Sequence, residues 1–150
     1  MKIIDKFEGD FDFLSNFSPH SFRDHAGVKW ETNEHYYQAM KTVNMLERGK
    51  IWSAPTPGIA KRIGQNITMR YNWANVRVGC MFEGVGMKFE QNKDIKDLLI
   101  STKGYELIEG NNWHDNIWGD CDCPKCENIT GKNLLGKVLM LVRRNYIDGE

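Results

Sequence analysis

The sequence predicts an α+β fold that is mainly α-helical, with a small β-sheet or hairpin near the N-terminus. Two observations lead to this prediction. Apolar residues recur at helical spacing in several segments after residue 32. The residues before that point instead form short runs typical of strands, separated by a glycine turn. The length of 150 residues suits one hydrophobic core, so residues 1–150 are expected to form a single domain.

The first elements along the chain are β-like. Residues 1–7 could form a short strand, and residues 20–23 and 28–32 flank a turn that ends at Gly27, which suggests a hairpin. A helix is then expected from Thr32 or Asn33, either of which can act as its N-cap, to about residue 48.

Helical patterns dominate the rest of the chain. Thr56 followed by Pro57 is typical of a helix start, and Gly64 ends that short helix. Asn72 can cap a longer helix whose three glycines indicate close packing or a kink. The predicted elements that follow the Gly64 helix are helices at 73–91, 94–101 and 133–145 and a strand at 105–109.

Composition and charge exclude several classes of protein. The 20 basic and 20 acidic side chains cancel, which argues against bulk binding of nucleic acid but leaves room for a local phosphate pocket. The N-terminus has no apolar signal region, and no apolar run approaches the roughly 20 residues of a membrane span. We therefore expect a cytoplasmic protein with reduced thiols and no membrane partner. The sequence does not indicate the oligomeric state.

One helix face carries an acid, an amide and an amine. Glu34, Gln38 and Lys41 are spaced at i, i+4 and i+7, so they share one face of the helix that follows Thr32. This spacing is compatible with a solvated helix side that has weak charge pairing. A catalytic face would need the same residues and, in addition, a cleft for them to line.

Three other segments hold candidate ligand-binding residues, each with an ordinary structural alternative such as a turn or a core aromatic. Aromatic side chains bracket a serine and an asparagine before Pro19, an arginine precedes a tryptophan at a predicted helix start, and a polar loop surrounds residue 115. Stacking of a base and binding of a phosphate are the expected roles. The candidates in these segments are Ser15, Asn16, Phe17, Arg70, Trp73, Asp115 and Trp118, with Lys61 and Lys88 as further phosphate ligands.

A cluster of thiols lies near the C-terminal helix. Cys121, Cys123 and Cys126 could form most of a zinc site, which would need a fourth ligand such as Cys80 or a histidine. Free thiols on a loop are the alternative, and a catalytic metal is not expected. His114 has no evident partner in the sequence and is expected at the surface.

The order of these motifs resembles the YbiA-like family, also called the NADAR domain. The matching text covers nearly the whole chain. It comprises F-L-S-N-F-S-P (13–19), W-x-T-N-E-H-Y-Y-Q-A-M-K (30–41), T-P-G-I-A-K-R-I-G (56–64), R-Y-N-W (70–73), K-F-E-Q-N (88–92), D-N-I-W-G (115–119) and G-K-N-L-L-G-K-V-L-M (131–140). The resemblance implies a single YbiA-like domain. The cysteine segment lies where the family tolerates insertions, so its role does not follow from the resemblance.

The resemblance also implies an enzyme that needs no cofactor. Members of the family are N-glycosidases, which cut the C1′–N bond between a base and a phosphorylated ribose. Their substrates are either ribosylamino-pyrimidine phosphates of riboflavin synthesis or ADP-ribose attached to guanine. Glu34 matches the family's essential acid and Lys41 its lysine, while Trp73, Asp115 and Trp118 match other motif positions. Glu34, Lys41 and Asp115 are therefore expected to be the catalytic residues, with Asp115 orienting the ribose hydroxyls or holding a water. The competing interpretations are a non-catalytic module that binds ADP-ribose or a nucleotide, and a zinc-stabilised interaction domain.

Overall fold

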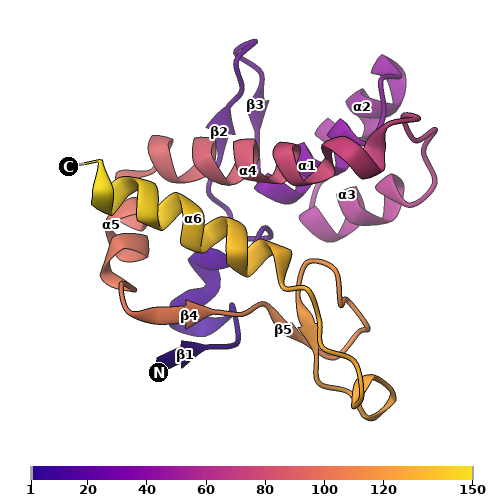
Figure 1. Ribbon diagram of the computed structural model, residues 1–150. Helices are drawn as coiled ribbons and strands as arrows, with labels where there is room; N and C mark the ends of the chain where they lie inside the picture. The colour runs from indigo at the N-terminus through magenta and orange to yellow at the C-terminus, as the bar shows by residue number, and fades with distance from the viewer. Residues whose placement is uncertain (1, 150) are drawn as a thin grey trace. The chain divides into compact units, whose positions relative to one another are not determined.

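The computed structural model describes residues 2–149 and shows a mostly helical chain with small two-stranded sheets, which confirms the predicted fold class (Figure 1). The chain divides into two compact units. A central unit comprises Asn16–Asn92, and a terminal unit combines the residues up to Ser15 with those from Lys93 onward. No helix within residues 2–149 is long and apolar enough to cross a membrane.

The central unit begins with the predicted hairpin. Strands β2 (Phe22–Arg23) and β3 (Lys29–Trp30) pair in antiparallel fashion, and Gly27 has a φ of 83° in the turn between them. The carboxylate of Asp24 accepts hydrogen bonds from two backbone N–H groups of the turn and from the indole of Trp30. The turn is therefore fixed by one aspartate and one glycine, as such turns commonly are.

The helix that follows is shorter than the sequence predicted. Helix α1 (Asn33–Met40) starts at Thr32, whose hydroxyl accepts the N–H of His35, but it ends at Lys41. A second helix, α2 (Met45–Trp52), starts separately at Asn44, whose side chain accepts two backbone N–H groups. The expectation of one helix to about residue 48 was wrong because Asn44 caps a new helix where apolar spacing alone suggested continuation.

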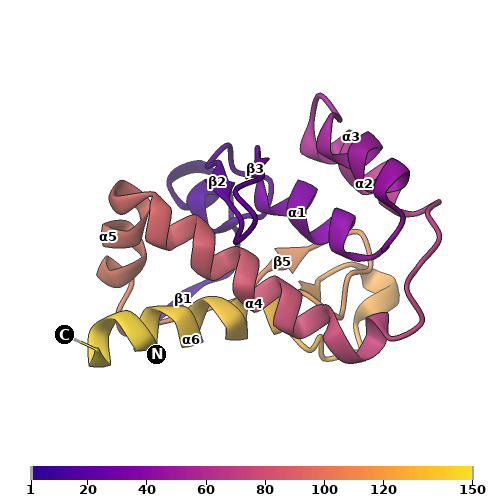
Figure 2. The same cartoon turned by 90° about the horizontal axis from the view of Figure 1, so that it is seen from above.

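The remaining helices of the central unit match the predicted ranges closely. They are α3 (Pro57–Gly64), capped by Thr56, and α4 (Trp73–Gln91). Both views show α2 and α3 beside α1, in agreement with the contacts among these three helices (Figures 1 and 2). The predicted close packing of α4 is found at Gly84, where a Cβ would collide with Asn33 and Tyr36. The core of this unit consists of Phe22, Trp30, Tyr36, Ala39, Ile51, Ala54 and Ala60.

The terminal unit pairs the start of the chain with its last third. Strand β1 (Lys2–Ile4) lies parallel to β4 (Tyr105–Leu107), and β5 (Gly110–Asn111) lies parallel to β6 (Asp120–Cys121). Residue 1 of the predicted first strand lies outside the described residues. Helix α5 (Lys93–Ser101) contacts α6 (Leu134–Asp148), and α6 also packs on β4. Short 3₁₀ turns occupy Gly9–Leu14 and Pro124–Cys126.

One side of α6 is apolar and mostly buried. Leu135, Val138, Leu139 and Val142 are buried, whereas Leu141 is exposed because it lies on the opposite side of the helix. Gly136 lets the helix approach β4 closely, since a Cβ there would collide with the carbonyl oxygen of Leu107.

Candidate active site

The acid of the predicted catalytic face is buried in the central unit. Glu34 is 6% exposed and Gln38 is 3% exposed, so this part of α1 is not a solvated helix side. The amide Nε2 of Gln38 donates a hydrogen bond of 2.7 Å to Glu34 Oε1. The backbone N–H of Glu34 donates to the carbonyl of Asn16 at 3.0 Å. Both the carboxylate and the start of its helix are therefore held in place.

A glycine makes this arrangement possible. A Cβ at Gly64, the last residue of α3, would collide with the side-chain amide of Gln38. Helix α3 can therefore approach α1 closely enough to enclose Gln38 only because residue 64 lacks a side chain. The orientation of the Glu34 carboxylate thus depends on a glycine 30 residues away in the sequence.

The amine of the same face lies at the end of α1. Lys41 is the C-cap residue and is half-buried, with its ammonium 5.7 Å from the centre of the Tyr37 ring. Burial lowers the pKa of Lys41 below its usual value, and the positive charge of Lys61 lowers it further, while the carboxylate of Glu34 opposes the shift. The amine is therefore easier to deprotonate than an exposed lysine.

The turn that carries Arg70 is joined directly to this lysine. The backbone N–H of Arg70 donates to the carbonyl of Lys41 at 2.7 Å. The Nε of Arg70 donates to Asn72 Oδ1 at 2.9 Å, which orients the guanidinium. Asn72 begins α4 as predicted, but its side chain serves Arg70 and makes no cap hydrogen bond.

Trp73 forms an aromatic pair with Tyr37. The two ring centroids are 5.2 Å apart at an angle of 56°, and Trp73 is 6% exposed. Tyr37 therefore contacts both the Trp73 ring and the Lys41 ammonium. This packing gives the amine an apolar wall, which is the physical origin of its desolvation.

Asn16 is hydrogen-bonded to the first turn of α1. Asn33 Nδ2 donates to Asn16 Oδ1 at 2.8 Å, and Asn16 Nδ2 points to Met81 Sδ at 3.5 Å. The side-chain groups of Asn16 are thus engaged within the central unit, whereas Phe17 is exposed. Ser15 is half-buried and belongs to the terminal unit.

The two further phosphate candidates differ in exposure. Lys61 is half-buried on α3 and acts electrostatically on Lys41. Lys88 is 1% exposed, and its ammonium lies 5.1 Å from the centre of the Phe89 ring. Binding of a phosphate by Lys61 or Lys88 stays a prediction.

The predicted Asp115 and Trp118 lie in the loop that joins β5 to β6 of the terminal unit. Asp115 Oδ1 accepts the N–H groups of Ile117 and Trp118 at 3.0 and 2.9 Å, so the carboxylate fixes a tight turn. Asn111 Nδ2 donates to the carbonyl of Asp115 at 2.8 Å. This structural role is established by the geometry, while contacts of Asp115 and Trp118 with a ligand stay predictions.

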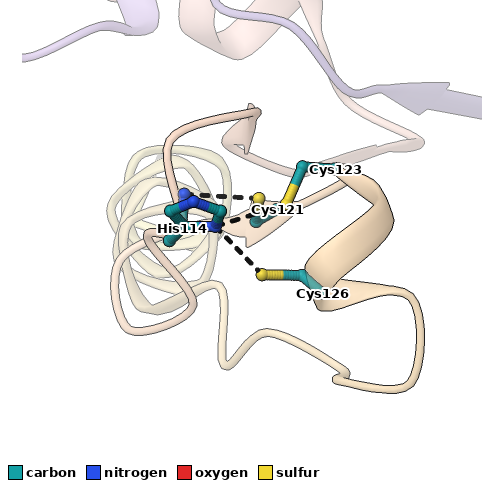
Figure 3. Close-up of side chains that lie close together, drawn as sticks. All are labelled: His114, Cys121, Cys123 and Cys126. Atoms are coloured by element: carbon teal, nitrogen blue, oxygen red, sulfur yellow. Dashed lines mark hydrogen bonds between the residues drawn. The ribbon is translucent and has the colours of Figure 1, made fainter.

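The same loop brings together four potential metal ligands. The Nδ1 of His114 and the sulfurs of Cys121, Cys123 and Cys126 all lie within 4.8 Å of one another (Figure 3). The expectation that His114 lacks a partner was wrong, although the residue is exposed. Cys80 lies on α4 in the central unit. The sequence did contain a signal for this fourth ligand, since His114 precedes Cys121, the first cysteine of the cluster, by seven residues.

Comparison with known proteins identifies the class of this enzyme. A model of the NADAR domain matches residues 5–146. The chain is 34% identical to N-glycosidase YbiA of Escherichia coli over 136 residues, which are 89% of this chain and 81% of YbiA. It is 40% identical to an N-glycosidase of Nostoc punctiforme over 135 residues, covering 87% and 82% of the two chains. The protein is thus an enzyme of the N-glycosyl hydrolase class.

The structural comparison leads to the same group. The NMR structure of E. coli YbiA superposes with a TM-score of 0.86 at 31% identity, covering 99% of this chain and 86% of YbiA. A riboflavin biosynthesis protein of Zea mays is 34% identical over 91% of this chain, which corresponds to 24% of the maize protein. The chain belongs to the NADAR family, as its motif order indicated.

Proposed function

We propose that the protein hydrolyses the C1′–N bond of a phosphorylated ribosylamino-pyrimidine. The observation that carries this proposal is a buried carboxylate, Glu34, on the same helix as a desolvated amine, Lys41. Support for the substrate comes from relatives in Zea mays and Vibrio vulnificus, both named riboflavin biosynthesis proteins, which align over 91% and 87% of this chain.

Glu34 has the chemistry needed at the reacting carbon. Breaking an N-glycosidic bond builds positive charge on C1′ and the ring oxygen, and a fixed carboxylate stabilises that charge. Because Gln38 holds Glu34 in a buried position, little reorganisation is needed when the charge develops. The carboxylate could also accept a proton from the attacking water.

Lys41 has two possible roles in the same step. As a general acid, its ammonium donates a proton to the nitrogen of the leaving base. As a nucleophile, its neutral amine attacks C1′, the base leaves with a proton, and the opened sugar forms an imine that water hydrolyses to regenerate the amine. The lowered pKa of Lys41 supports the second role, since only the neutral amine has a free electron pair.

The remaining predicted residues are assigned to binding. Arg70 is proposed to bind the phosphate, since a guanidinium matches phosphate oxygens with paired donors. Tyr37 and Trp73 shield the reacting amine from water. Gln38 positions Glu34. The other predicted residues are proposed to contact the ribose or the base, or to hold the loop conformation. They are Ser15, Asn16, Phe17, Asp115 and Trp118.

A substrate panel tests the proposal. Purified protein is incubated with ribosylamino-pyrimidine phosphates and, separately, with ADP-ribosylated guanosine, and the released base and sugar phosphate are separated by chromatography. Release from the pyrimidine substrate is expected, and Glu34→Gln should abolish it while the exposed neighbour variant Glu31→Gln retains it. Release only from the ADP-ribosylated guanosine would contradict the proposed substrate. Tight binding of either compound without release would instead indicate a binding module.

A further inference from the structure

Four side chains of the terminal unit form a compact group of nitrogen and sulfur atoms. The Nδ1 of His114 is 3.2 Å from the sulfur of Cys123 and 3.5 Å from that of Cys126, and Cys121 completes the set (Figure 3). In a tetrahedral zinc site, bond lengths near 2.3 Å for sulfur and 2.0–2.1 Å for nitrogen place neighbouring ligand atoms about 3.6–3.8 Å apart. The group therefore has the size of one such coordination sphere.

The backbone of the loop presents these side chains to a common centre. His114 has a φ of 70°, which is uncommon for a residue with a side chain. Cys123 directly precedes the short 3₁₀ turn Pro124–Cys126, Cys126 is its last residue, and the N–H of Cys126 donates to the carbonyl of Cys123 at 3.0 Å. Two cysteines in such a turn are the common half of a structural zinc site.

Nearby N–H groups already point at the sulfurs. The backbone N–H of His114 donates to Cys121 Sγ, and Asn116 Nδ2 donates to Cys126 Sγ, each at 3.3 Å. The carbonyl oxygen of the same Asn116 side chain accepts the N–H of Cys121 at 2.9 Å. Metal-bound thiolates carry negative charge and are stabilised by such donors. The loop therefore contains hydrogen-bond donors to the sulfur ligands as well as the ligands themselves.

We propose that His114, Cys121, Cys123 and Cys126 bind one Zn²⁺ ion in a structural site. Three thiolates and one imidazole match the ligand preference of zinc, and four protein ligands leave no position for water or substrate. The role is therefore to fix the loop. Because His114 and Cys121 flank residues 115–118, the ion would also fix the turn that Asp115 caps.

Stabilisation of this loop by a metal is physically reasonable. Strands β5 and β6 have two residues each, and the ligands Cys121 and Cys126 are buried in a region with little regular structure. Metal coordination can replace the hydrophobic packing that such a segment lacks. This inference does not depend on the proposed substrate.

Metal analysis of the purified protein tests the proposal. The chain is expressed without a histidine tag in zinc-supplemented medium, purified with a reductant, and analysed for zinc, iron, nickel and copper by mass spectrometry. We expect about one zinc ion per chain. Cys80→Ser, the matched control outside the group, should retain the zinc, whereas Cys123→Ser and Cys126→Ser should lose it. Zinc retained unchanged in these two variants, or iron in its place, would overturn the proposal.

Two further measurements cover the case in which a cysteine variant fails to fold. Wild-type protein stripped with a chelator and titrated with Co²⁺ should give the absorption of tetrahedral cobalt with thiolate ligands. Hydrogen exchange should become faster in residues 111–127 on metal removal and stay unchanged in residues 33–40 of α1. Stripped protein that shows no thiolate–cobalt absorption, or no change in exchange within the loop, would refute the site. His114→Cys should keep the metal, since it replaces one ligand with another.

Discussion

The face of α1 and the loop that carries His114 hold two clusters of reactive side chains, and they are built in different ways. On α1, helical spacing alone places Glu34, Gln38 and Lys41 on one side. The first two are buried and the third is half-buried. In the loop, His114 reaches the cysteines through an unusual backbone angle and a turn held by side-chain hydrogen bonds. Regular secondary structure makes the first cluster predictable, while the second depends on irregular backbone.

The two clusters also differ in what burial does to them. On α1 the buried charges stay separate, with an amide holding the acid and aromatic rings shielding the amine. Burial of this kind tunes reactivity. In the loop the reactive atoms converge on one another within 4.8 Å, which is the arrangement for holding an ion. Substitutions on the α1 face, and of residues packed against it, should therefore alter activity more than they alter metal content.

The largest effect is expected from Glu34→Gln. The substitution keeps the shape and the ability to accept from Gln38 but removes the negative charge that we propose stabilises C1′ in the transition state. We expect kcat to fall at least about 100- to 1,000-fold, the usual cost of losing one electrostatic stabiliser. Steady-state kinetics with base release measures it, and thermal unfolding should show that the variant stays folded. Unchanged kcat would remove Glu34 from the mechanism.

Lys41→Met should be the next most damaging change, with kcat reduced about 100- to 10,000-fold through loss of the acid or nucleophile. Reduction by borohydride during turnover separates the two roles. A covalent adduct that peptide mapping places on Lys41 shows the imine, and its absence under turnover conditions favours the general acid. Lys103→Met, at an exposed position, is the control and should keep full activity.

Gly64→Ala tests whether close packing controls the acid. The added methyl group collides with the Gln38 amide, so we expect the free energy of unfolding to fall by about 1–3 kcal/mol, together with a lower kcat. Gly49→Ala is the matched control in a neighbouring helix, where a Cβ meets open space. That variant should be up to about 1 kcal/mol more stable. Equal behaviour of the two variants in thermal unfolding would show that the Gln38 contact is unimportant.

The smallest effect is expected from Lys61→Gln. Removing this cation raises the pKa of Lys41, because Lys61 is one of the groups that lower it. If the neutral amine reacts, activity rises with pH through the Lys41 pKa, and the variant's rising limb shifts to higher pH. If the ammonium is the acid, activity falls with pH, and the falling limb shifts to higher pH instead. Arg62→Gln is the control and should leave the pH profile of kcat unchanged.

Much of the helical framework could be predicted from the sequence. Caps such as Thr32 and Thr56 and the apolar spacing of α3, α4 and α6 are local signals, and local signals determine where helices begin. The break between α1 and α2 was missed because apolar spacing continues across it. The Lys41 carbonyl, just after α1, accepts from Arg70 in a distant turn, a contact that residue spacing does not encode.

Non-local contacts also explain why the sequence did not predict the two-residue strands β5 and β6. The same holds for the partners of His114. Parallel pairing of Gly110–Asn111 with Asp120–Cys121 leaves no periodicity in so short a segment. The convergence of His114 on the cysteines depends on that pairing and on Asn116, which contacts two of the cysteines. Both are properties of the folded loop that residue spacing does not encode.

The hydrogen bond from the Arg70 N–H to the Lys41 carbonyl has a consequence for how this protein can be altered. The bond joins main-chain atoms only, so it does not depend on the side chain at position 41 or 70, provided that residue 70 is not proline. If Arg70 binds the phosphate as proposed, a different side chain at position 70 should change which anionic group is accepted, while the main chain at position 41 keeps its place. Selectivity and reactivity could then be engineered as separate properties of one scaffold.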